Sequence, residues 1–253
     1  MLKTLMARWR QGHRTIRYPE APAVLPPRFR GRPELHPERC PSGCRACVAA
    51  CPTGAVSTDG GTLRMDLGRC LFCPECAAAC PSGALTFTTD HRLATSTRED
   101  LVTDGREVRL ARRLAAESLR LFGRSLRLRQ VSAGGCGACE AETNVLGTVV
   151  FDLGRFGISF VASPRHADGL LITGPVTRNM VLALAKTQAA VPPPKLVIVV
   201  GACAISGGPY RGHPEVLDGA ASAGPAVLYV PGCPPHPLTI LDGLLRLLGR
   251  QVS

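Results

Sequence analysis

Residues 70–81 read Cys-Leu-Phe-Cys-Pro-Glu-Cys-Ala-Ala-Ala-Cys-Pro, which places cysteines at positions 70, 73, 76 and 80. Three thiolates at this spacing lie on one tight loop and can bind three corners of a four-iron cluster, while the fourth points away to a neighbouring cluster. The proline that follows ends the local helical turn. The stretch therefore predicts a [4Fe–4S] site that shares its run of cysteines with a second site nearby.

A second run of cysteines lies upstream and repeats this pattern. The stretch Cys47-Val-Ala-Ala-Cys51-Pro-Thr-Gly-Ala-Val matches Cys76-Ala-Ala-Ala-Cys80-Pro-Ser-Gly-Ala-Leu at an offset of 29 residues. Because the fourth cysteine of each run binds the cluster of the other run, the repeat predicts two interlocked clusters. We expect the first cluster to use Cys40, Cys44, Cys47 and Cys80, and the second to use Cys51, Cys70, Cys73 and Cys76.

The first run departs from the regular spacing, since three residues separate Cys40 from Cys44 where two are usual. Gly43 can accommodate the extra residue in the loop, but whether this cluster holds four irons stays open. The alternative for these cysteines is structural zinc, which CxxC pairs also bind. Zinc sites usually take one pair from each of two separate knuckles, so four-cysteine runs closed by Cys-Pro favour iron–sulfur clusters.

The second half of the chain alternates short apolar, β-branched runs with helical patterns. This alternation is typical of a parallel sheet whose strands are connected by helices. The predicted strands are Leu126–Val131, Gly157–Ala162, Gly169–Thr173, Lys195–Val200 and Ala226–Val230. The predicted helices include Val176–Ala190 and Leu238–Leu248.

Four further cysteines follow three of these predicted strands in glycine-rich turns. They are Cys136, Cys139, Cys203 and Cys233. Sheets of this class bind ligands beyond the carboxyl ends of their strands, and glycine lets the backbone approach a cluster closely. We therefore expect a third four-thiolate site, with zinc or inert buried cysteines as the alternatives.

The composition limits the classes of protein to consider. The chain has 253 residues, twelve cysteines and a formal charge of +11. The stretch Met1–Arg10 has basic residues within its apolar part and lacks the long apolar core of an export signal. A reducing, cytoplasmic location is expected, in which twelve cysteines indicate metal ligands and not disulfides. No apolar run approaches the ~18 residues of a membrane-spanning helix.

The chain divides into four regions on these patterns: a basic, proline-rich arm (1–33), the eight-cysteine module (34–92), a connector (93–125) and the α/β module (126–253). The connector is predicted to hold a basic amphipathic helix through Val108, Ala111, Ala115, Leu119 and Phe122. The arm is predicted to begin with a short amphipathic helix whose apolar side is Leu2, Leu5, Met6 and Trp9. A helix of this kind can rest on an anionic membrane or dock on a protein.

Both halves resemble known families. Residues 1 to about 100, including Tyr18-Pro19-Glu20 and Arg28-Phe29-Arg30-Gly31, resemble the 2[4Fe–4S] ferredoxin-like subunits of formate hydrogenlyase, membrane hydrogenases and complex I. Residues 126–253 resemble the small subunit of group 4 membrane-bound [NiFe] hydrogenases and the homologous cluster-bearing component of complex I. The matching stretches are Asp152-Leu-Gly-Arg-Phe-Gly-Ile158, Ala162-Ser-Pro-Arg-His-Ala-Asp168, Thr173-Gly-Pro-Val-Thr-Arg-Asn-Met180, Gly201-Ala-Cys-Ala-Ile-Ser-Gly-Gly208 and Pro231-Gly-Cys-Pro-Pro235.

The resemblance implies a fold and a function. The implied fold is an α+β ferredoxin-like dicluster domain followed by an α/β flavodoxin-like parallel-sheet domain. The implied function is an electron-transfer subunit with three [4Fe–4S] clusters and no catalytic centre of its own. The implied partners are a hydrogenase large subunit (similar to the D component of complex I), the membrane subunits of the complex and an electron donor or acceptor protein, at the cytoplasmic face of the membrane.

Details of the resemblance favour the hydrogenase branch. Complex I subunits carry adjacent cysteines at the first position of the third site, whereas hydrogenase small subunits carry Cys-x2-Cys, as Cys136 and Cys139 do here. The usual Cys-Asn-Gly-Cys-Asp is replaced here by Cys-Gly-Ala-Cys-Glu, which changes the surroundings of the ligands but not the ligands. The alternative is a complex I-like oxidoreductase subunit linked to a quinone or a ferredoxin.

Residues near the third site are also implied by the resemblance. Arg165 matches a position that the family places near the cluster, where a cation raises the reduction potential, but it can instead pair with Asp168 or a partner. Glu142 matches an acidic position facing the large subunit, with proton relay or helix-dipole stabilisation as its two interpretations. His166 and His236 either tune the cluster or serve as ordinary hydrogen-bonding side chains.

A nucleic-acid binder built on zinc is the remaining alternative for a basic, cysteine-rich chain. The aromatic content is only 4% and no recognition helix is evident, so the sequence argues against it. Each [4Fe–4S]²⁺ core with four thiolates carries a charge of about −2. Three such sites would offset about half of the positive charge, so the basic excess is weak evidence for nucleic acid.

Overall fold

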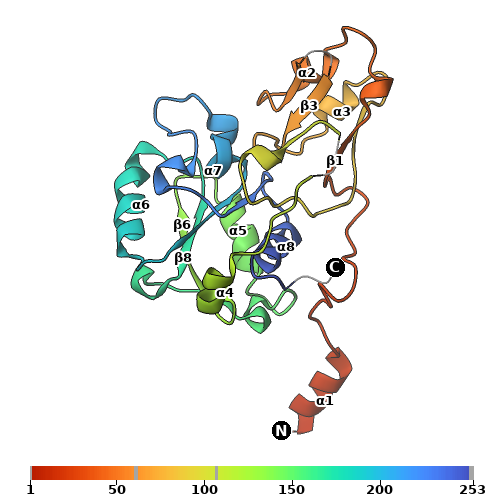
Figure 1. The fold of residues 1–253 in the computed structure, drawn as a ribbon. Coiled ribbons are helices and arrows are strands. Elements are labelled where there is room, and N and C mark those ends of the chain that lie inside the picture. Colours follow the sequence, from red (N-terminus) through yellow and green to blue (C-terminus); the bar gives the residue numbers. More distant parts are fainter. Residues whose placement is uncertain (1, 60–61, 106–107, 251–253) are drawn as a thin grey trace.

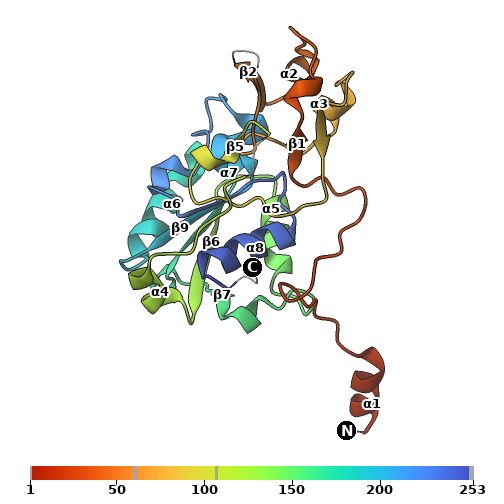
Figure 2. The ribbon, with the colours of Figure 1, turned by 45° about the vertical axis from the view of Figure 1, so that its right-hand side comes forward.

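The computed structural model describes residues 2–59, 62–105 and 108–250. A five-stranded sheet module forms the body of the molecule, and the eight-cysteine module lies at one end of it (Figure 1). The N-terminal helix α1 (Leu2–Gln11) projects from the opposite end, as Figure 2 also shows. No described helix has both the length and the apolar content that crossing a membrane requires.

All five strands of the large sheet run parallel, which confirms the α/β prediction for the second half of the chain. Their order is β10-β9-β8-β6-β7, and each neighbouring pair is parallel. Numbered within the sheet, this is the 2-1-3-4-5 order of flavodoxin-like folds. The strands are β6 (Leu126–Ser132), β7 (Ile158–Phe160), β8 (Gly169–Thr173), β9 (Leu196–Val200) and β10 (Leu228–Val230).

Helices cover both faces of this sheet. Strands β8 and β9 are buried along their whole length, as expected for central parallel strands. The helices are α4 (Ala116–Phe122), α5 (Ala138–Val145), α6 (Arg178–Ala190), α7 (Ala202–Ser206) and α8 (Pro237–Leu247). Helix α8 is buried over nearly all its residues and forms the main core with one face of the sheet. The predicted helices Val176–Ala190 and Leu238–Leu248 are therefore confirmed with small changes at their ends.

The predicted connector helix is much shorter than expected. Only Ala116–Phe122 is helical, and residues 108–115 form an irregular stretch of chain. The Ala111 N–H donates to the Ala94 carbonyl at 2.7 Å, and the Leu114 N–H donates to the Leu247 carbonyl at 2.9 Å. These long-range bonds occupy the backbone groups that a helix would use, so tertiary packing overrides the helical pattern.

The eight-cysteine module is built from two short helices and antiparallel strands. Strand β1 (Pro33–Leu35) pairs with β4 (Leu85–Phe87), while β3 (Thr62–Asp66) pairs with both β2 (Val56–Asp59) and β5 (Val102–Thr103). Helices α2 (Ala46–Ala50) and α3 (Glu75–Ala78) follow the cysteine loops. This confirms a small α+β module, and β5 extends its sheet with residues from the predicted connector.

The two modules are joined by specific contacts around Gly68. The Ser206 hydroxyl, on α7, donates to the Gly68 carbonyl at 2.8 Å. A Cβ atom at Gly68 would lie 2.8 Å from Ile205 Cγ2 and 2.9 Å from Arg98 Cζ, so a larger residue would have to displace these side chains. Arg98 in turn donates two hydrogen bonds to Asp66, at 2.9 and 2.7 Å. The loop that leads into Cys70 is thus held directly against the helix that carries Cys203.

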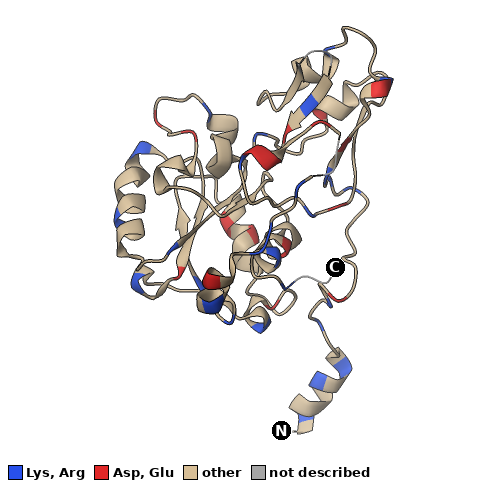
Figure 3. Ribbon diagram, viewed as in Figure 1, with Lys and Arg blue, Asp and Glu red and all other residues tan. Residues whose placement is uncertain are grey.

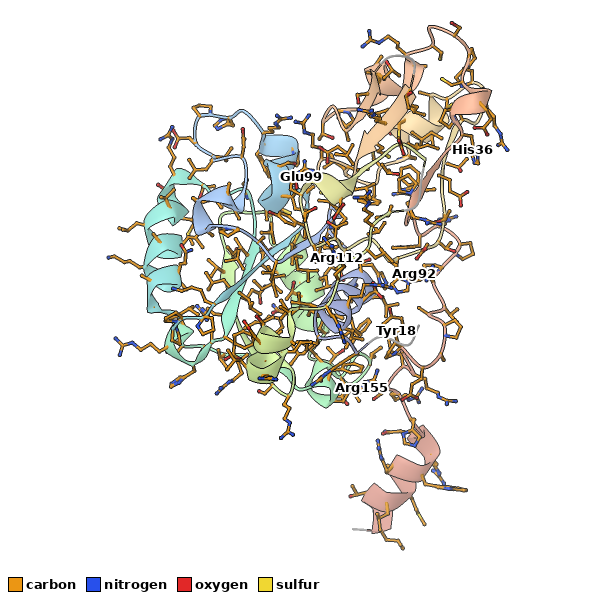
Figure 4. All side chains as sticks on the ribbon, viewed as in Figure 1. Tyr18, His36, Arg92, Glu99, Arg112 and Arg155 are labelled. Carbon is orange, nitrogen blue, oxygen red and sulfur yellow. The ribbon has the colours of Figure 1, made fainter. Side chains whose placement is uncertain are left out.

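The N-terminal arm crosses the sheet module before it reaches the eight-cysteine module. The Ile16 N–H donates to the Val150 carbonyl at 2.9 Å, and Arg155 donates to the Tyr18 carbonyl at 2.7 Å. Figure 4 labels Tyr18 and Arg155 close to this crossing. The Tyr18 hydroxyl donates to Asp242 at 2.7 Å, which ties the arm to α8.

Asp242 also accepts a hydrogen bond from Arg246 at 2.6 Å, and the Asp242 residue is only 2% exposed. Replacing Asp242 by alanine would leave the Arg246 guanidinium and the Tyr18 hydroxyl without their buried acceptor. Loss of one partner from a buried ion pair costs about 3–5 kcal/mol. We expect the thermal unfolding midpoint of the holoprotein to fall by roughly 10 °C, measured by circular dichroism.

The matched control is Glu117→Ala on α4, where the acidic side chain is exposed. Exposed substitutions of this kind change stability by less than about 0.5 kcal/mol. Equal midpoints for the Asp242 and Glu117 variants would contradict the structural role of this pair.

Candidate iron–sulfur sites

Four cysteines meet beyond the carboxyl edge of the large sheet. Cys136 lies in the turn after β6, Cys139 in the first turn of α5, Cys203 on α7 after β9, and Cys233 after β10. Strands β9 and β10 are neighbours, and β8 separates β9 from β6. Parallel strands deliver their carboxyl ends to one edge, so residues far apart in sequence converge there. Cys203 is buried, Cys139 is half-buried, and Cys136 and Cys233 are exposed.

Two glycines lie very close to the sulfur atoms of two of these cysteines. A Cβ atom on Gly201 would lie 2.5 Å from Cys139 Sγ, and one on Gly208 would lie 2.9 Å from Cys203 Sγ. Both glycines have positive φ angles, +91° and +54°, which side-chain-bearing residues rarely adopt. The sequence therefore needs glycine here both for backbone conformation and for room beside sulfur.

The four thiols are close enough to influence one another's charge. Burial raises the pKa of Cys203 to about 11, and Cys233 and Cys136 add to the increase. Burial likewise raises the pKa of Cys139, and the Cys203 thiol adds to the increase. Without a bound cation such a group resists ionisation, because each thiolate would repel the others. A metal centre that supplies positive charge relieves this repulsion, so the donor set fits a cluster.

The two cysteine runs of the smaller module repeat in three dimensions. The Ala55 N–H donates to Cys51 Sγ and the Ala84 N–H donates to Cys80 Sγ, each at 3.2 Å. Gly54 and Gly83, which precede these donors, have nearly equal φ angles of +61° and +62°. Hydrogen bonds from backbone N–H groups to sulfur stabilise thiolates and are a feature of cluster environments.

These hydrogen bonds prepare the last cysteine of each run for ligation. Burial acts to raise the pKa of Cys51, but N–H groups at Thr53 and Ala55 outweigh it, so this pKa is lowered. Burial also acts to raise the pKa of Cys80, but N–H groups at Ser82 and Ala84 outweigh it in the same way, and the pKa of Cys80 is lowered.

In this module, thiols of one cysteine run raise the pKa of thiols in the other run. Burial raises the pKa of Cys47, and the Cys80 and Cys40 thiols raise it further. Burial raises the pKa of Cys76 to about 11, with Cys73 and Cys51 adding to it. Cys80 therefore lies near thiols of the first run, and Cys51 lies near thiols of the second.

Thiols of one predicted ligand set also lie near thiols of the next. The first set is Cys40, Cys44, Cys47 and Cys80, and the second set is Cys51, Cys70, Cys73 and Cys76. Cys47 of the first set contributes to the raised pKa of Cys76 in the second set, after burial and the other thiols of that set. Burial raises the pKa of Cys233 in the sheet module, and Cys136 and then Cys73 of the second set add to it. The second set therefore lies between the first set and the sheet-module set.

Among the described residues, no three His, Cys, Asp or Glu side chains are grouped closely enough to hold one metal ion. A zinc site gathers its ligands around one atom, whereas each thiolate of a cubane cluster binds a different iron.

Family models match both modules. The model described as "4Fe-4S dicluster domain" matches residues 39–84, and the model described as "NADH ubiquinone oxidoreductase, 20 Kd subunit" matches residues 136–247. A "Probable membrane-bound hydrogenase subunit" of Pyrococcus furiosus is 38% identical over 140 residues, covering 55% of this chain and 83% of that protein.

This chain belongs to the family of the 20 kDa complex I subunit and the related membrane-bound hydrogenase subunits. The chain thus joins a 4Fe-4S dicluster domain to the domain of this family.

Other members show both branches of the family. Formate hydrogenlyase subunit 7 of Escherichia coli is 41% identical over 136 residues, which cover 54% of this chain and 53% of that protein. The corresponding NADH-quinone oxidoreductase subunit of Citrifermentans bemidjiense is 43% identical over 113 residues, covering 45% of this chain and 66% of that protein. The chain thus spans about half the length of the E. coli relative.

Side chains that the family resemblance singled out lie in different settings. Arg165 and His166 lie in a short 3₁₀ turn, Pro164–His166, where both side chains are exposed. Asp168, the suggested partner of Arg165, instead lies 3.8 Å from Arg127 and accepts a hydrogen bond from the Arg127 N–H.

The other two candidates are partly buried. Glu142 is half-buried on α5, and burial raises its pKa. His236 caps α8, because its Nδ1 accepts a hydrogen bond from the Leu238 N–H at 3.1 Å. Its ring also packs edge-on against Phe29. His236 is therefore a hydrogen-bonded structural side chain.

Glu140 is the residue that the sequence left without a role. It follows Cys139 directly and accepts hydrogen bonds from the Ser132 and Thr173 hydroxyls, each at 2.6 Å. Burial acts to raise the pKa of Glu140, but these two hydrogen bonds outweigh it and the pKa is lowered. The sequence feature that could have drawn attention to Glu140 is an acidic residue directly after a predicted ligand, at the start of a helix.

Proposed function

We propose that this chain holds three [4Fe–4S] clusters and conducts electrons between a redox partner and a catalytic large subunit. The observation that carries the proposal is the packing that brings the three thiol sets near one another. Helix α2, which carries Cys47, packs against α3, which carries Cys76. The Ser206 hydroxyl on α7 donates to the Gly68 carbonyl, two residues before Cys70. A [4Fe–4S] cluster takes up and releases one electron at a time. Three sites held near one another would form one continuous route through the protein.

The protein's own residues would bind and insulate these clusters. The ligands would be Cys40, Cys44, Cys47 and Cys80; Cys51, Cys70, Cys73 and Cys76; and Cys136, Cys139, Cys203 and Cys233. Backbone N–H groups at Ala55 and Ala84 donate to sulfur. The Ser206–Gly68 contact holds the second and third sites together.

The regions proposed for these roles follow the sequence boundaries. Residues 34–92 would form the dicluster domain and residues 126–253 the third-site domain. Residues 1–33 would serve as the basic arm, and 93–125 would connect the two domains. One covalent chain keeps all three sites in fixed proportion and raises their effective concentration.

The proposed partner is the large subunit of a group 4 [NiFe] hydrogenase. Support comes from the Cys-x2-Cys spacing of Cys136 and Cys139, and from the hydrogenase relatives in E. coli and P. furiosus. The exposed Cys136 belongs to the third set, which would end the route on the side where a large subunit docks. A complex I-like subunit without [NiFe] chemistry is the second candidate, supported by 43% identity to the NADH-quinone oxidoreductase relative in C. bemidjiense.

Purified complex, isolated without oxygen, tests both candidates. We expect about twelve irons in this chain and H₂ evolution when reduced viologen is supplied to the complex. A large subunit that lacks nickel and reduces a quinone instead would favour the second candidate. Colourless protein with bound zinc would contradict both.

We further propose that α1 rests on the cytoplasmic face of the membrane beside the membrane subunits. Its residues are all exposed, including Trp9 at 87% and Leu5 at 65%. Figure 3 shows basic residues and no acidic residues on this helix, and the first acidic residue of the chain is Glu20. An exposed apolar stripe flanked by positive charge suits an anionic lipid surface.

Vesicle flotation of the holoprotein tests this placement. We expect binding to phosphatidylglycerol vesicles and little binding to phosphatidylcholine vesicles. The double variant Leu5→Glu/Trp9→Glu should bind at least about tenfold more weakly, because it places charge in the apolar stripe. Leu121→Glu on α4, where Leu121 is also exposed, is the control. Unchanged binding of the double variant would rule out this contact.

A further inference from the structure

Glu140 occupies a defined position at the third site. It lies in the first turn of α5, one residue after Cys139. One carboxylate oxygen, Oε1, accepts both the Ser132 hydroxyl at the end of β6 and the Thr173 hydroxyl at the end of β8. Because β6 and β8 are adjacent in the sheet, the carboxylate is pinned to two neighbouring strand ends. Its position is therefore set by the core of the sheet and not by a mobile loop.

The same carboxylate lies against the loop that carries Cys136. A Cβ atom on Gly135 would be 3.9 Å from Glu140 Oε1. Gly174, directly after Thr173, packs against this loop so closely that its own Cβ would lie 2.6 Å from the Gly135 nitrogen. The Glu140 carboxylate thus lies beside the residue that precedes Cys136, and Glu140 itself directly follows Cys139.

The described part of the chain supplies no cationic partner for the negative charge of Glu140. Both of its donors are neutral hydroxyls, and the ion pairs found among the described residues do not include it. A partly buried charge is screened less than an exposed one, so it acts on its surroundings over a short distance.

We propose that Glu140 is a positioning residue that lowers the reduction potential of the cluster at the third site through its fixed negative charge. This rests on the proposed function. When the third site accepts one electron from the second site, its negative charge grows by one and no bond is made or broken. A carboxylate held nearby repels the added electron, so the oxidised state is favoured. The reduced third site is then a stronger electron donor to an acceptor docked at the exposed Cys136.

The effect proposed for Glu140 is opposite in sign to the effect expected of Arg165. A cation near the cluster would raise the reduction potential, whereas the carboxylate would lower it. The charge that the structure holds against the cysteine loops is the Glu140 carboxylate. The third site is therefore expected to be harder to reduce than the same site with a neutral residue at position 140.

A redox titration followed by electron paramagnetic resonance tests the proposal on the full-length holoprotein. In Glu140→Gln, we expect the ratio of reduced to oxidised third cluster at a fixed potential to rise about tenfold. This equals a shift of about 59 mV for a one-electron couple. The other two clusters should keep their potentials, because Glu140 does not touch their ligands. Glu140→Asp keeps the charge and should stay within about threefold of the wild type.

Glu215→Gln is the matched control, since it removes an exposed acid from the same module. Glu140→Ala gives a second neutral variant in case Glu140→Gln fails to retain the cluster. A loaded third cluster with unchanged potential in either neutral variant overturns the inference. Loss of the cluster in both neutral variants, with retention in Glu140→Asp, also overturns it by showing a purely structural role. Wild-type protein without a third cluster would instead reject the proposed function.

Discussion

Cys203→Ser removes one complete cluster: bound iron falls from about twelve to about eight atoms per chain, and the spectrum of the third site disappears. Cys203 is 7% exposed on α7, and a Cβ atom added at Gly208 would lie 2.9 Å from its sulfur. The sulfur is therefore largely shielded from solvent. Serine is a poor ligand for iron because its hydroxyl does not ionise readily.

Electron delivery should fail along with the iron. Because the third site ends the proposed route, the complex should lose more than about 99% of its viologen-driven H₂ evolution, which corresponds to about 3 kcal/mol. Iron and sulfide analysis together with paramagnetic resonance measure the first effect, and gas chromatography measures the second. Ser222→Ala, an exposed change in the same module, serves as the control. Twelve irons in the Cys203 variant would show that Cys203 is not a ligand.

The second large expected effect concerns which cysteine substitutions abolish the same cluster signal. We expect Cys51→Ser and Cys70→Ser to abolish the same cluster signal, and Cys47→Ser and Cys80→Ser to abolish the other. The reason is that Cys51 contributes to the raised pKa of Cys76, whereas Cys80 contributes to that of Cys47. Each variant should lose about four irons.

The four variants act as controls for one another. If each run held its own cluster, Cys47→Ser and Cys51→Ser would abolish the same signal, since both belong to the first run. Paramagnetic resonance of the reduced proteins distinguishes the two patterns. The second set should be the more sensitive one to changes at the module boundary, because Gly68 and Ser206 join there just before Cys70.

Much of the fold was predictable because the local signals agree with the tertiary structure. Central strand β8 (Gly169–Thr173) matches its predicted range, since a run of buried β-branched and apolar residues has few other conformations open to it. The helix expected from Val108 was wrong over residues 108–115. There the apolar residues pack as an irregular segment, and the Ala111 N–H is bonded to Ala94. Periodicity cannot distinguish an amphipathic helix from a chain whose backbone bonds to distant segments.

The candidate site also has features that the sequence shows and features that only the structure shows. The twelve cysteines, their runs and their glycine-rich turns are visible in the sequence, because cluster ligation demands particular residue types at short spacing. The importance of Glu140 was not visible. Its two hydroxyl donors, Ser132 and Thr173, come from strands that are 41 residues apart in the chain and adjacent only in the sheet.

By itself, the sequence determined the identity and grouping of the thiols, the alternation that builds a parallel sheet and the basic, apolar character of the arm. These are local properties, set by residue type and by spacing along one stretch of chain. The tertiary structure alone decided that the second set lies between the other two, with Cys73 near Cys233. It also decided that Glu140 is pinned beside the third site. Both depend on which surfaces pack together, and packing is a property of the whole chain.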